Sequence, residues 1–221
     1  MRRVKCNNLE EAVDEFVNNL GYRLDMIIPA DSPREVQLSK NGETVRLVSE
    51  PAAVASGLPQ HSASSDPKEF LGQLQPPPIG AGSYRWTAGR AGMMYRDLMP
   101  DRMGGKMAVS HIRLTEGGEV PDYVHYHKIE FQMIRCIKGR IKVVYEDQGE
   151  PFWLEPGDWV IQPPEIRHRV LECEAGSEVI EVSMPAEHET WVDHEMTLPT
   201  TALRPDREFN GQRFVRFIAP K

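Results

Sequence analysis

The second half of the chain consists of short strand-like runs with no long helical pattern between them. The runs recur at intervals of about 8–12 residues, separated by Gly, Pro and Asp as in the turn Pro156-Gly157-Asp158. Short strands with such turns are typical of antiparallel sandwiches and barrels. We therefore expect a mainly β domain over residues 84–221, built from the runs KMAVSHIRLT, FQMIRCIKG, RIKVVYED, PFWL, WVIQPP, RHRVLEC and EVIEVSMPA.

One of these runs follows two histidines that are two residues apart. They are His125 and His127, in the segment PDYVHYHKIEFQMIRCIKGR. Successive side chains of a strand alternate between its faces, so the two imidazoles are expected to point the same way. A third histidine, His168, follows a Pro-Pro pair in GDWVIQPPEIRHRV. Because neutral imidazole is a common metal ligand, three histidines on neighbouring strands predict a site for one cation.

The first of these segments resembles the first motif of the cupin superfamily. That motif has two histidines separated by one residue, then a carboxylate, then six residues and a glycine. His125, His127 and Gly139 match it, and Gln132 stands where the family usually has glutamate. The departure puts a neutral amide in the place of a charged ligand.

The second segment resembles the second cupin motif. Gly157 is followed by five residues and Pro163, and His168 lies four residues after Pro164. The resemblance covers roughly residues 100–186 and lies in a strand-rich chain, the context that the motifs require. It implies a double-stranded β-helix, the RmlC-like jelly-roll barrel of metal-binding cupins.

By this resemblance one divalent metal ion is implied, with His125, His127 and His168 as ligands. Gln132 is the favoured fourth ligand, because its place in the first motif selects it. Glu130 is the alternative, since it precedes Gln132 by two residues and would share its strand face. If Glu130 does not bind the metal, we expect it to serve as the catalytic general base.

The resemblance also bears on activity, although a fold alone does not select one. Our leading hypothesis is an iron(II) dioxygenase-type oxidoreductase that acts on a small phenolic, diketone or carboxylate molecule. A metal-dependent isomerase or decarboxylase, a small-ligand-binding cupin without catalysis, and a cupin that has lost its metal are the alternatives. Imidazole ligands suit iron, which we favour, but also manganese, nickel and zinc.

The first 50 residues form a separate pattern, with a helix flanked by strand-like runs. The helix is expected to begin at a cap on Asn7 or Asn8 and to end at Gly21. Its apolar face would comprise Leu9, Val13, Phe16, Val17 and Leu20. Together with RRVKC, YRLDMIIP, REVQLS and TVRLVS it predicts the order βαβββ. This stretch resembles a half-module of the glyoxalase/bleomycin-resistance (vicinal oxygen chelate) superfamily. With Glu50 as its one candidate ligand, we expect it to have a structural or dimerisation role.

The middle of the chain is rich in proline, with six of the eighteen prolines between Pro51 and Pro78. We expect residues 51–83 to be a linker, with a short helix at DPKEFLGQL as one option. The sequence therefore predicts three parts: residues 1–50, 51–83 and 84–221.

Composition narrows the classes of partner and compartment. The net charge is −7, with 40% hydrophobic and 27% charged residues, which gives no reason to expect nucleic acid or an anionic membrane as a partner. We find no apolar stretch of the roughly 18 residues that a spanning helix needs, and the N-terminus has no signal-peptide core. Three scattered cysteines favour the reducing cytoplasm. We expect a cytoplasmic protein, a homodimer, with a small molecule as its ligand.

Several other polar residues have a less specific pattern. His111 could be a core histidine or one that supports a ligand. The arginines of the strand-like runs are expected to face solvent, although an inward one would bind a carboxylate; they are Arg113, Arg135, Arg167 and Arg169. His188 and His194, in PAEHETWVDHEM, are expected to belong to a polar segment that leaves the barrel and not to a second metal cluster.

Overall fold

The computed structural model describes residues 1–49 and 85–221. The predicted linker, its optional helix and Glu50 lie outside the described residues. Helices are few and short: α1 (Leu9–Asp14), the π-helical turn η1 (Glu15–Asn19), the 3-10 turn η3 (Arg90–Gly92) and α3 (Arg102–Gly105). Within the described ranges, every helix is too short and too polar to span a bilayer.

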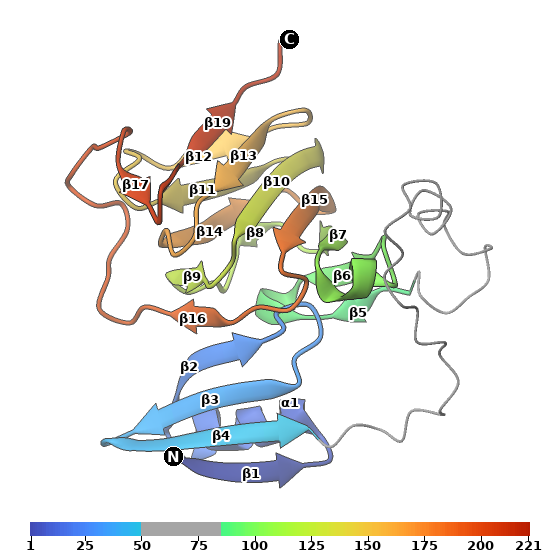
Figure 1. Cartoon of the computed structure of the whole chain (residues 1–221), viewed down its shortest axis with the longest axis vertical. Coiled ribbons are helices and arrows are strands. Elements are labelled where there is room, and N and C mark those ends of the chain that lie inside the picture. The colour runs from blue at the N-terminus through green and yellow to red at the C-terminus, as the bar shows by residue number, and fades with distance from the viewer. Residues whose placement is uncertain (50–84) are drawn as a thin grey trace.

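The strands precede, form and close a barrel (Figure 1). In the first fifty residues they are β1 (Arg2–Cys6), β2 (Arg23–Ile28), β3 (Glu35–Lys40) and β4 (Glu43–Ser49). The barrel begins with β5 (Thr87–Ala88), β6 (Met94–Asp97), β7 (Ala108–Leu114), β8 (Gly118–Glu119), β9 (His125–His127) and β10 (Phe131–Lys138). It continues with β11 (Ile141–Tyr145), β12 (Phe152–Leu154), β13 (Trp159–Gln162), β14 (His168–Cys173), β15 (Ser177–Met184) and β16 (Thr190–Val192). The last strands are β17 (Glu208–Phe209), β18 (Gln212–Arg213) and β19 (Val215–Phe217).

Two sheets face each other around the barrel core. One has the order β1-β4-β3-β2-β16-β9-β14-β11-β12, with β8 paired to β14, and the other has the order β19-β13-β10-β15-β7-β6-β5. Apart from β1 and β4, the neighbouring strands of both sheets are antiparallel. The chain therefore has the mainly β jelly-roll fold that its sequence predicts.

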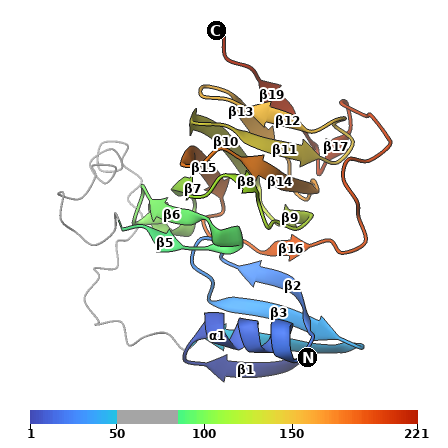
Figure 2. The ribbon, with the colours of Figure 1, turned by 180° about the vertical axis from the view of Figure 1, so that it is seen from behind.

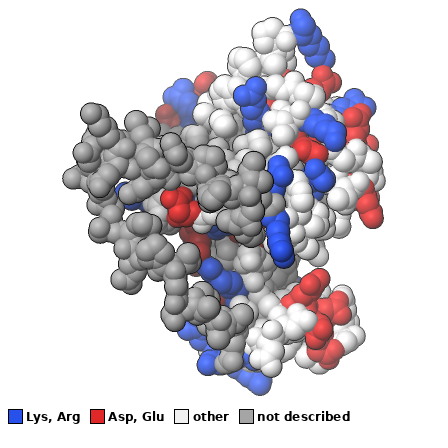
Figure 3. Space-filling model, turned by 90° about the vertical axis from the view of Figure 1, so that its right-hand side faces the viewer, with Lys and Arg blue, Asp and Glu red and all other residues white. Residues whose placement is uncertain are grey.

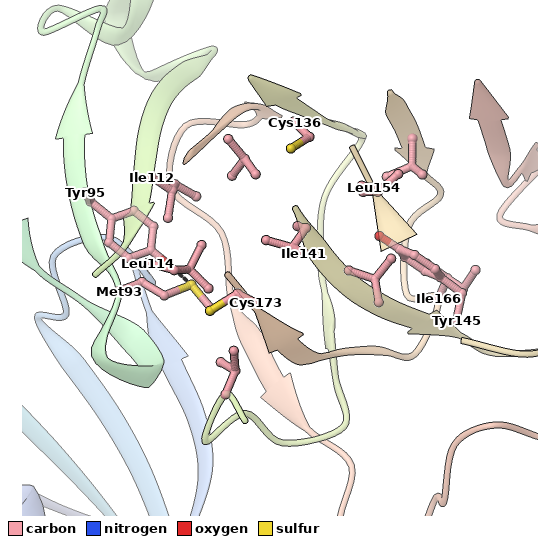
Figure 4. Close-up of a cluster of buried hydrophobic side chains, with 14 of the residues drawn as sticks. Met93, Tyr95, Ile112, Leu114, Cys136, Ile141, Tyr145, Leu154, Ile166 and Cys173 are labelled. Carbon is pink, nitrogen blue, oxygen red and sulfur yellow. Dashed lines mark hydrogen bonds between the residues drawn. The ribbon is translucent and has the colours of Figure 1, made fainter. Parts of the chain in front are cut away.

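A continuous apolar core with residues from both sheets fills the barrel. Tyr145 lies beside Leu154 and Ile166, and Met93 and Tyr95 lie beside Ile112 at the other end of the cluster (Figure 4). These side chains are nearly all inaccessible to solvent, and burying each large apolar side chain stabilises the fold by about 1.5–3 kcal/mol. Core residues and polar side chains of β9, β10 and β14 line one cavity inside the barrel.

The first fifty residues have the predicted element order, and they continue the barrel sheet. Strand β2 pairs with β16, with Ile27 opposite Thr190 and Met26 opposite Trp191. Helix α1 lies on one face of β1, β3 and β4 (Figure 2), over Leu38, Val45 and Leu47. The boundaries of the three predicted parts remain predictions, but the first and last share one sheet.

The helix departs from its prediction at its C-terminal end. Asn8 caps it as expected, accepting a hydrogen bond from the Glu11 backbone N–H at 3.3 Å. The last turn is π-helical, because the Leu20 N–H donates to the Glu15 carbonyl oxygen, five residues back. This wider turn takes Leu20 off the apolar face, and 44% of the residue is exposed. The prediction that Leu20 shares the apolar face of the helix was wrong.

The glycine that ends the first motif occupies a position where a side chain does not fit. Gly139 has φ +61°, and a Cβ there would lie 2.4 Å from the Ser177 hydroxyl oxygen. We expect Gly139→Ala to lower the free energy of unfolding by about 3 kcal/mol in urea titrations, from the left-handed backbone and the clash together. Gly176→Ala is the matched control, since Gly176 has φ +73° and open space at its Cβ, and it should cost only about 1 kcal/mol. Equal losses in the two variants would contradict the clash.

Charged side chains of both signs are interspersed on the described surface visible in Figure 3. This pattern is typical of a solvated face. The absence of a nucleic-acid partner stays a prediction.

Candidate metal centre

Three histidines meet inside the barrel where β9 lies between β14 and β16. His125 is opposite His168 in the β9–β14 pair, and His127 is opposite Thr190 in the β9–β16 pair. All three imidazoles are buried, and each offers a ligand atom within 4.8 Å of those of the other two. The alternation of side chains along a strand places His125 and His127 on this one face, as the sequence predicts.

The hydrogen bonds of the three rings direct the same nitrogen of each ring toward the others. His125 Nδ1 lies 2.7 Å from the Tyr123 carbonyl oxygen, and His168 Nδ1 lies 3.0 Å from the Ile166 carbonyl oxygen. A carbonyl only accepts, so both rings carry their proton on Nδ1 and have a lone pair on Nε2. His127 Nδ1 lies 2.9 Å from the Thr190 hydroxyl, which can accept in the same way.

The residues present fit a divalent cation. His125 Nε2 is fully buried and has no hydrogen-bond partner, an arrangement that is costly unless the lone pair is used. Burial lowers the pKa of His125, His127 and His168 well below the usual histidine value. The Arg90 charge lowers all three further, and neighbouring histidine rings also lower those of His127 and His168. The rings are therefore neutral, the form that binds a metal ion.

Two glutamines lie beside the histidines, on β10 and β13. Gln132 is opposite Gln162 in register, and each is only 1% exposed. The Gln162 amide nitrogen donates to Gln132 Oε1 at 2.9 Å and lies 3.3 Å from His168 Nε2. Gln132 Nε2 is buried without a hydrogen-bond partner. Gln132 thus lies in the cavity with its oxygen near the histidines, and its role as fourth ligand remains a prediction.

Glu130 does not lie with these residues. The residue is exposed and precedes β10, which begins at Phe131. The alternation that links Gln132 to Ile134 does not extend back across the bend between β9 and β10, so Glu130 does not share their face. Glu130 is thus outside the cavity lining, and its expected roles as a ligand and as a general base stay predictions.

A carboxylate does reach the cavity, from β15. Glu181 is opposite Ile134 in the β10–β15 pair, and both line a cavity of about 40 Å³ together with His127, Gln132 and His168. Burial raises the pKa of Glu181 to about 7, against the opposing effects of the Arg90 charge and the Gln132 amide. Its signal in the sequence is a lone acid that alternates with Val179 and Ser183, on the inward face of EVIEVSMPA.

A cation also lines the cavity, and the sequence did not single it out. Arg90 lies in η3 and forms an ion pair with Asp122, whose side chain is wholly buried. Asp122 also accepts backbone N–H bonds from Tyr123 (2.9 Å) and Val170 (3.0 Å), which fixes the pair beside His125. The Arg90 Nε–H has no hydrogen-bond partner in this buried position. No strand alternation marks a residue in a 3-10 turn, so its inward direction could not be read from the sequence.

The other polar residues singled out in the sequence lie outside this cavity. His111 is on the opposite face of β7, where it bonds to Glu178 at 2.7 Å and lies beneath Trp86. Arg113 and Arg167 pair with acids at the barrel exterior, Glu178 and Asp193.

The two histidines beyond β15 do not form a cluster of their own. His188 packs edge-on against the His127 ring, with centroids 5.3 Å apart. His194 donates a hydrogen bond from Nε2 to the Leu24 carbonyl oxygen at 2.8 Å and lies 3.6 Å from the Asp25 carboxylate, both on β2. Among the residues that the structure describes, the one group of three or more potential ligands is the His125 cluster.

The buried histidines make the metal-free protein sensitive to acid. Burial lowers the pKa values of His125, His127 and His168 well below 6.5, so near pH 5 the unfolded chain binds these protons and the folded chain does not. Burial lowers the pKa of His188 in the same direction. Glu181 acts oppositely, because the folded state keeps its proton up to about pH 7. Unfolding therefore takes up protons at acid pH. For each unit by which the pH falls near pH 5, the free energy of unfolding should fall by up to about 4 kcal/mol.

Urea titrations of chelator-treated protein between pH 7.5 and 5 would measure this slope. His188→Asn should reduce it, by at most about 1.4 kcal/mol per pH unit. A free energy of unfolding that does not change over this range would contradict neutral, buried histidines.

Comparisons with known proteins concern the same region. The family model described as "Cupin domain" matches residues 110–182, about one third of the chain. A comparison with curated proteins gives no significant match.

Solved structures similar to the chain include several cupins. An RmlC-like cupin from Shewanella frigidimarina has 22% identity and a TM-score of 0.39 over 48% of this chain and 87% of its own. KdgF from Halomonas sp. has 19% identity and a TM-score of 0.37 over 46% and 86%. A mutant form of Bacillus subtilis oxalate decarboxylase has 18% identity and a TM-score of 0.38 over 47% and 28%.

None of these comparisons identifies a glyoxalase-like module in the first fifty residues, and that resemblance is not confirmed. The cupin resemblance of the barrel has more support, because the strand order, the two histidine segments and the family match all concern the same region. The match over residues 110–182, on a jelly-roll fold, supports the assignment of this barrel to the cupin superfamily.

Proposed function

We propose that this protein is a metal-dependent enzyme that acts on a small organic acid. The observation that carries the proposal is the content of one cavity: Glu181 and Arg90 line it together with His127 and His168. An anion-binding cation, a carboxyl group with a pKa near 7 and a cluster of neutral imidazoles are the components of acid–base catalysis at a metal centre.

The metal would be held by His125, His127 and His168, with Gln132 in reach. A divalent ion bound there supplies Lewis acidity that polarises a substrate oxygen. Because the three imidazoles are neutral, they leave the full charge of the ion available for this purpose. Iron, manganese, nickel and zinc all suit such ligands.

Arg90 is placed to bind the acid group of the substrate. Its guanidinium lies at the cavity wall, is held by Asp122 and keeps an unpaired Nε–H. A guanidinium that is fixed in this way binds a carboxylate with directional hydrogen bonds. The cavity of about 40 Å³ has room for about three water molecules, so the part of the substrate that enters it is small.

Glu181 is placed to move a proton. Its carboxyl group lines the cavity opposite the histidines and is outside the ligand cluster, so it can take a proton from a carbon or oxygen next to the polarised group and return it elsewhere. This favours isomerisation or decarboxylation over reactions that need no acid or base.

Iron(II)-dependent dioxygenation is the second candidate. Its support is the apolar lining of the cavity, with Met93, Ile112, Leu114 and Val179 among its residues, because apolar walls suit a bound dioxygen molecule. Small-ligand binding without catalysis is the third reading, in which the same groups recognise an acid and do not transform it.

The first fifty residues have a structural role in this proposal. The loop after β2 carries Ala30, whose carbonyl accepts the Arg90 backbone N–H at 3.4 Å, and Asp31, which pairs with Arg102. Strand β2 meanwhile extends the sheet that holds His125 and His127. The module thus supports one wall of the cavity. Homodimer formation and a cytoplasmic location stay predictions.

The experiment that tests the proposal compares proton exchange with oxygen uptake. Metal-loaded protein would be incubated in deuterated water with a panel of small hydroxy and keto acids. We expect metal-dependent deuterium incorporation, seen by NMR, without oxygen consumption at an electrode. Oxygen uptake that needs iron would favour the second candidate. Binding of an acid by calorimetry with neither reaction would favour the third.

A further inference from the structure

Gln162 occupies the place where the histidines converge, although neither cupin-like motif assigns it a role. It is the last residue of β13, is 1% exposed and lines the cavity with His127 and His168. Its amide nitrogen lies 3.3 Å from His168 Nε2 and 2.9 Å from Gln132 Oε1. Its amide oxygen accepts a hydrogen bond from the Tyr145 hydroxyl at 2.6 Å.

These distances match the spacing between neighbouring ligands of one cation. Two donor atoms that each lie 2.1 Å from a metal are about 3.0 Å apart at a right angle and about 3.4 Å apart in a tetrahedron. The separation of Gln162 from His168, 3.3 Å, falls within this range, and that from Gln132, 2.9 Å, lies just below its lower end. The amide of Gln162 is therefore close enough to both atoms to share a cation with them.

In its present orientation the Gln162 amide cannot bind a cation, because its NH2 group faces the site. The Gln162 N–H groups donate to the His168 lone pair and to Gln132, and a metal on that lone pair would face these hydrogens. A half-turn of the terminal amide exchanges nitrogen and oxygen with almost no change of shape. Gln162 Oε1 then faces the cation, and its nitrogen donates to the Tyr145 oxygen.

We infer that Gln162 supplies an amide oxygen ligand to the cation that His125, His127 and His168 bind, an inference that rests on the proposed metal centre. Tyr145 is the positioning residue for this ligand. Its hydroxyl meets the Gln162 amide in both directions, as donor now and as acceptor after the half-turn.

The aromatic neighbours of Tyr145 fix the position of its ring. It stacks on the His168 ring, with centroids 5.5 Å apart, and contacts Phe214 at 4.5 Å. The Tyr145 hydroxyl therefore stays aimed at Gln162, and the amide turns about a fixed partner.

The extra ligand limits how substrate binds. If the oxygens of Gln132 and Gln162 both joined the three imidazoles, few positions on the cation would remain free, and this would favour substrate binding through a single oxygen. Chelation of the metal by two substrate oxygens would require one amide to leave. This favours the proton-transfer chemistry proposed above over reactions in which substrate and dioxygen share the metal.

The test is a Co²⁺ titration of the full chain by calorimetry and visible absorption. We expect Gln162→Met, which keeps the length but has no oxygen, to raise the Kd about tenfold, and Tyr145→Phe to raise it by less. Gln162→Glu should lower the Kd about tenfold by adding charge. Loss of one ligand should also strengthen the Co²⁺ d–d bands, because lower coordination numbers absorb more.

Gln148 provides the matched control, since it is a half-buried glutamine that is not among the cavity residues. Gln148→Met and Gln148→Glu should leave the Kd and the spectrum unchanged. If wild-type protein binds Co²⁺ and Gln162→Met binds it with the same Kd and spectrum, the Gln162 inference is overturned and the metal centre stands. If the wild type does not bind Co²⁺, both fall.

Discussion

Replacing His125 by alanine should remove most of the thermal stabilisation that a divalent metal gives to this protein. His125 Nε2 is buried and has no partner, and its Nδ1–H is fixed by the Tyr123 carbonyl, so its lone pair is directed at the site. Loss of a group that merely orients a ligand costs 10–100-fold in metal affinity, and we expect loss of the ligand itself to cost more than about 100-fold.

The stabilisation at stake is large. At a metal concentration near 1,000 times the Kd, binding adds about 4 kcal/mol to the stability of the native state, which raises the Tm of a chain of this size by roughly 10 °C. Differential scanning fluorimetry with and without Co²⁺ or Zn²⁺ measures this shift. His194→Ala is the control, because His194 contacts β2 and lies outside the cluster, and it should keep the full shift. A normal shift in His125→Ala would mean that the metal binds elsewhere.

Replacing Glu181 by glutamine should lower turnover by about 10²–10⁴-fold while the metal stays bound. The substitution keeps the shape of the side chain and removes its ability to carry a proton. The carboxyl group lines the cavity and is not part of the histidine cluster, so metal content and Tm should be close to those of the wild type. Deuterium exchange on the substrate found in the screen gives the rate.

Glu130→Gln is the matched control for this experiment. Glu130 is exposed and its side chain is not among the cavity residues, so this variant should keep wild-type activity. The opposite result, with Glu130→Gln inactive and Glu181→Gln active, would support the role that the sequence suggested for Glu130.

Part of the histidine cluster could be predicted from the sequence by strand alternation alone. His125 and His127 are two residues apart in one strand, and their separation fixes their common face. His168 needed a further assumption, that β14 lies next to β9, which the motif resemblance supplied. The structure pairs His168 with His125 directly.

The prediction that Glu130 shares a strand face with Gln132 failed because alternation was extended across a break in the strand. Lys128 to Glu130 connect β9 to β10 outside either strand, so face and parity are no longer linked there. Leu20 failed for a related reason, since a single π-helical turn changed the phase of the helix. Such local irregularities depend on tertiary contacts that periodicity does not record.

The positions of Arg90 and Glu181 at the cavity could not be predicted from sequence periodicity. Arg90 comes from a 3-10 turn and is placed by Asp122 and by the loop after β2, which are 32 and roughly 60 residues away in the chain. Glu181 had a signal, an acid on an apolar strand face, but its meaning depends on which sheet faces the histidines. Only the three-dimensional arrangement shows that both residues line the cavity.

If His125, His127 and His168 hold one divalent metal ion, the purified protein should contain it. Tag-free protein purified without oxygen would be measured by plasma mass spectrometry, beside His168→Ala prepared in the same way. We expect close to one metal ion per chain in the wild type and almost none in the variant. Equal metal content in the two proteins, or no metal in the wild type even after incubation with Fe²⁺, Mn²⁺, Ni²⁺ and Zn²⁺, would contradict it.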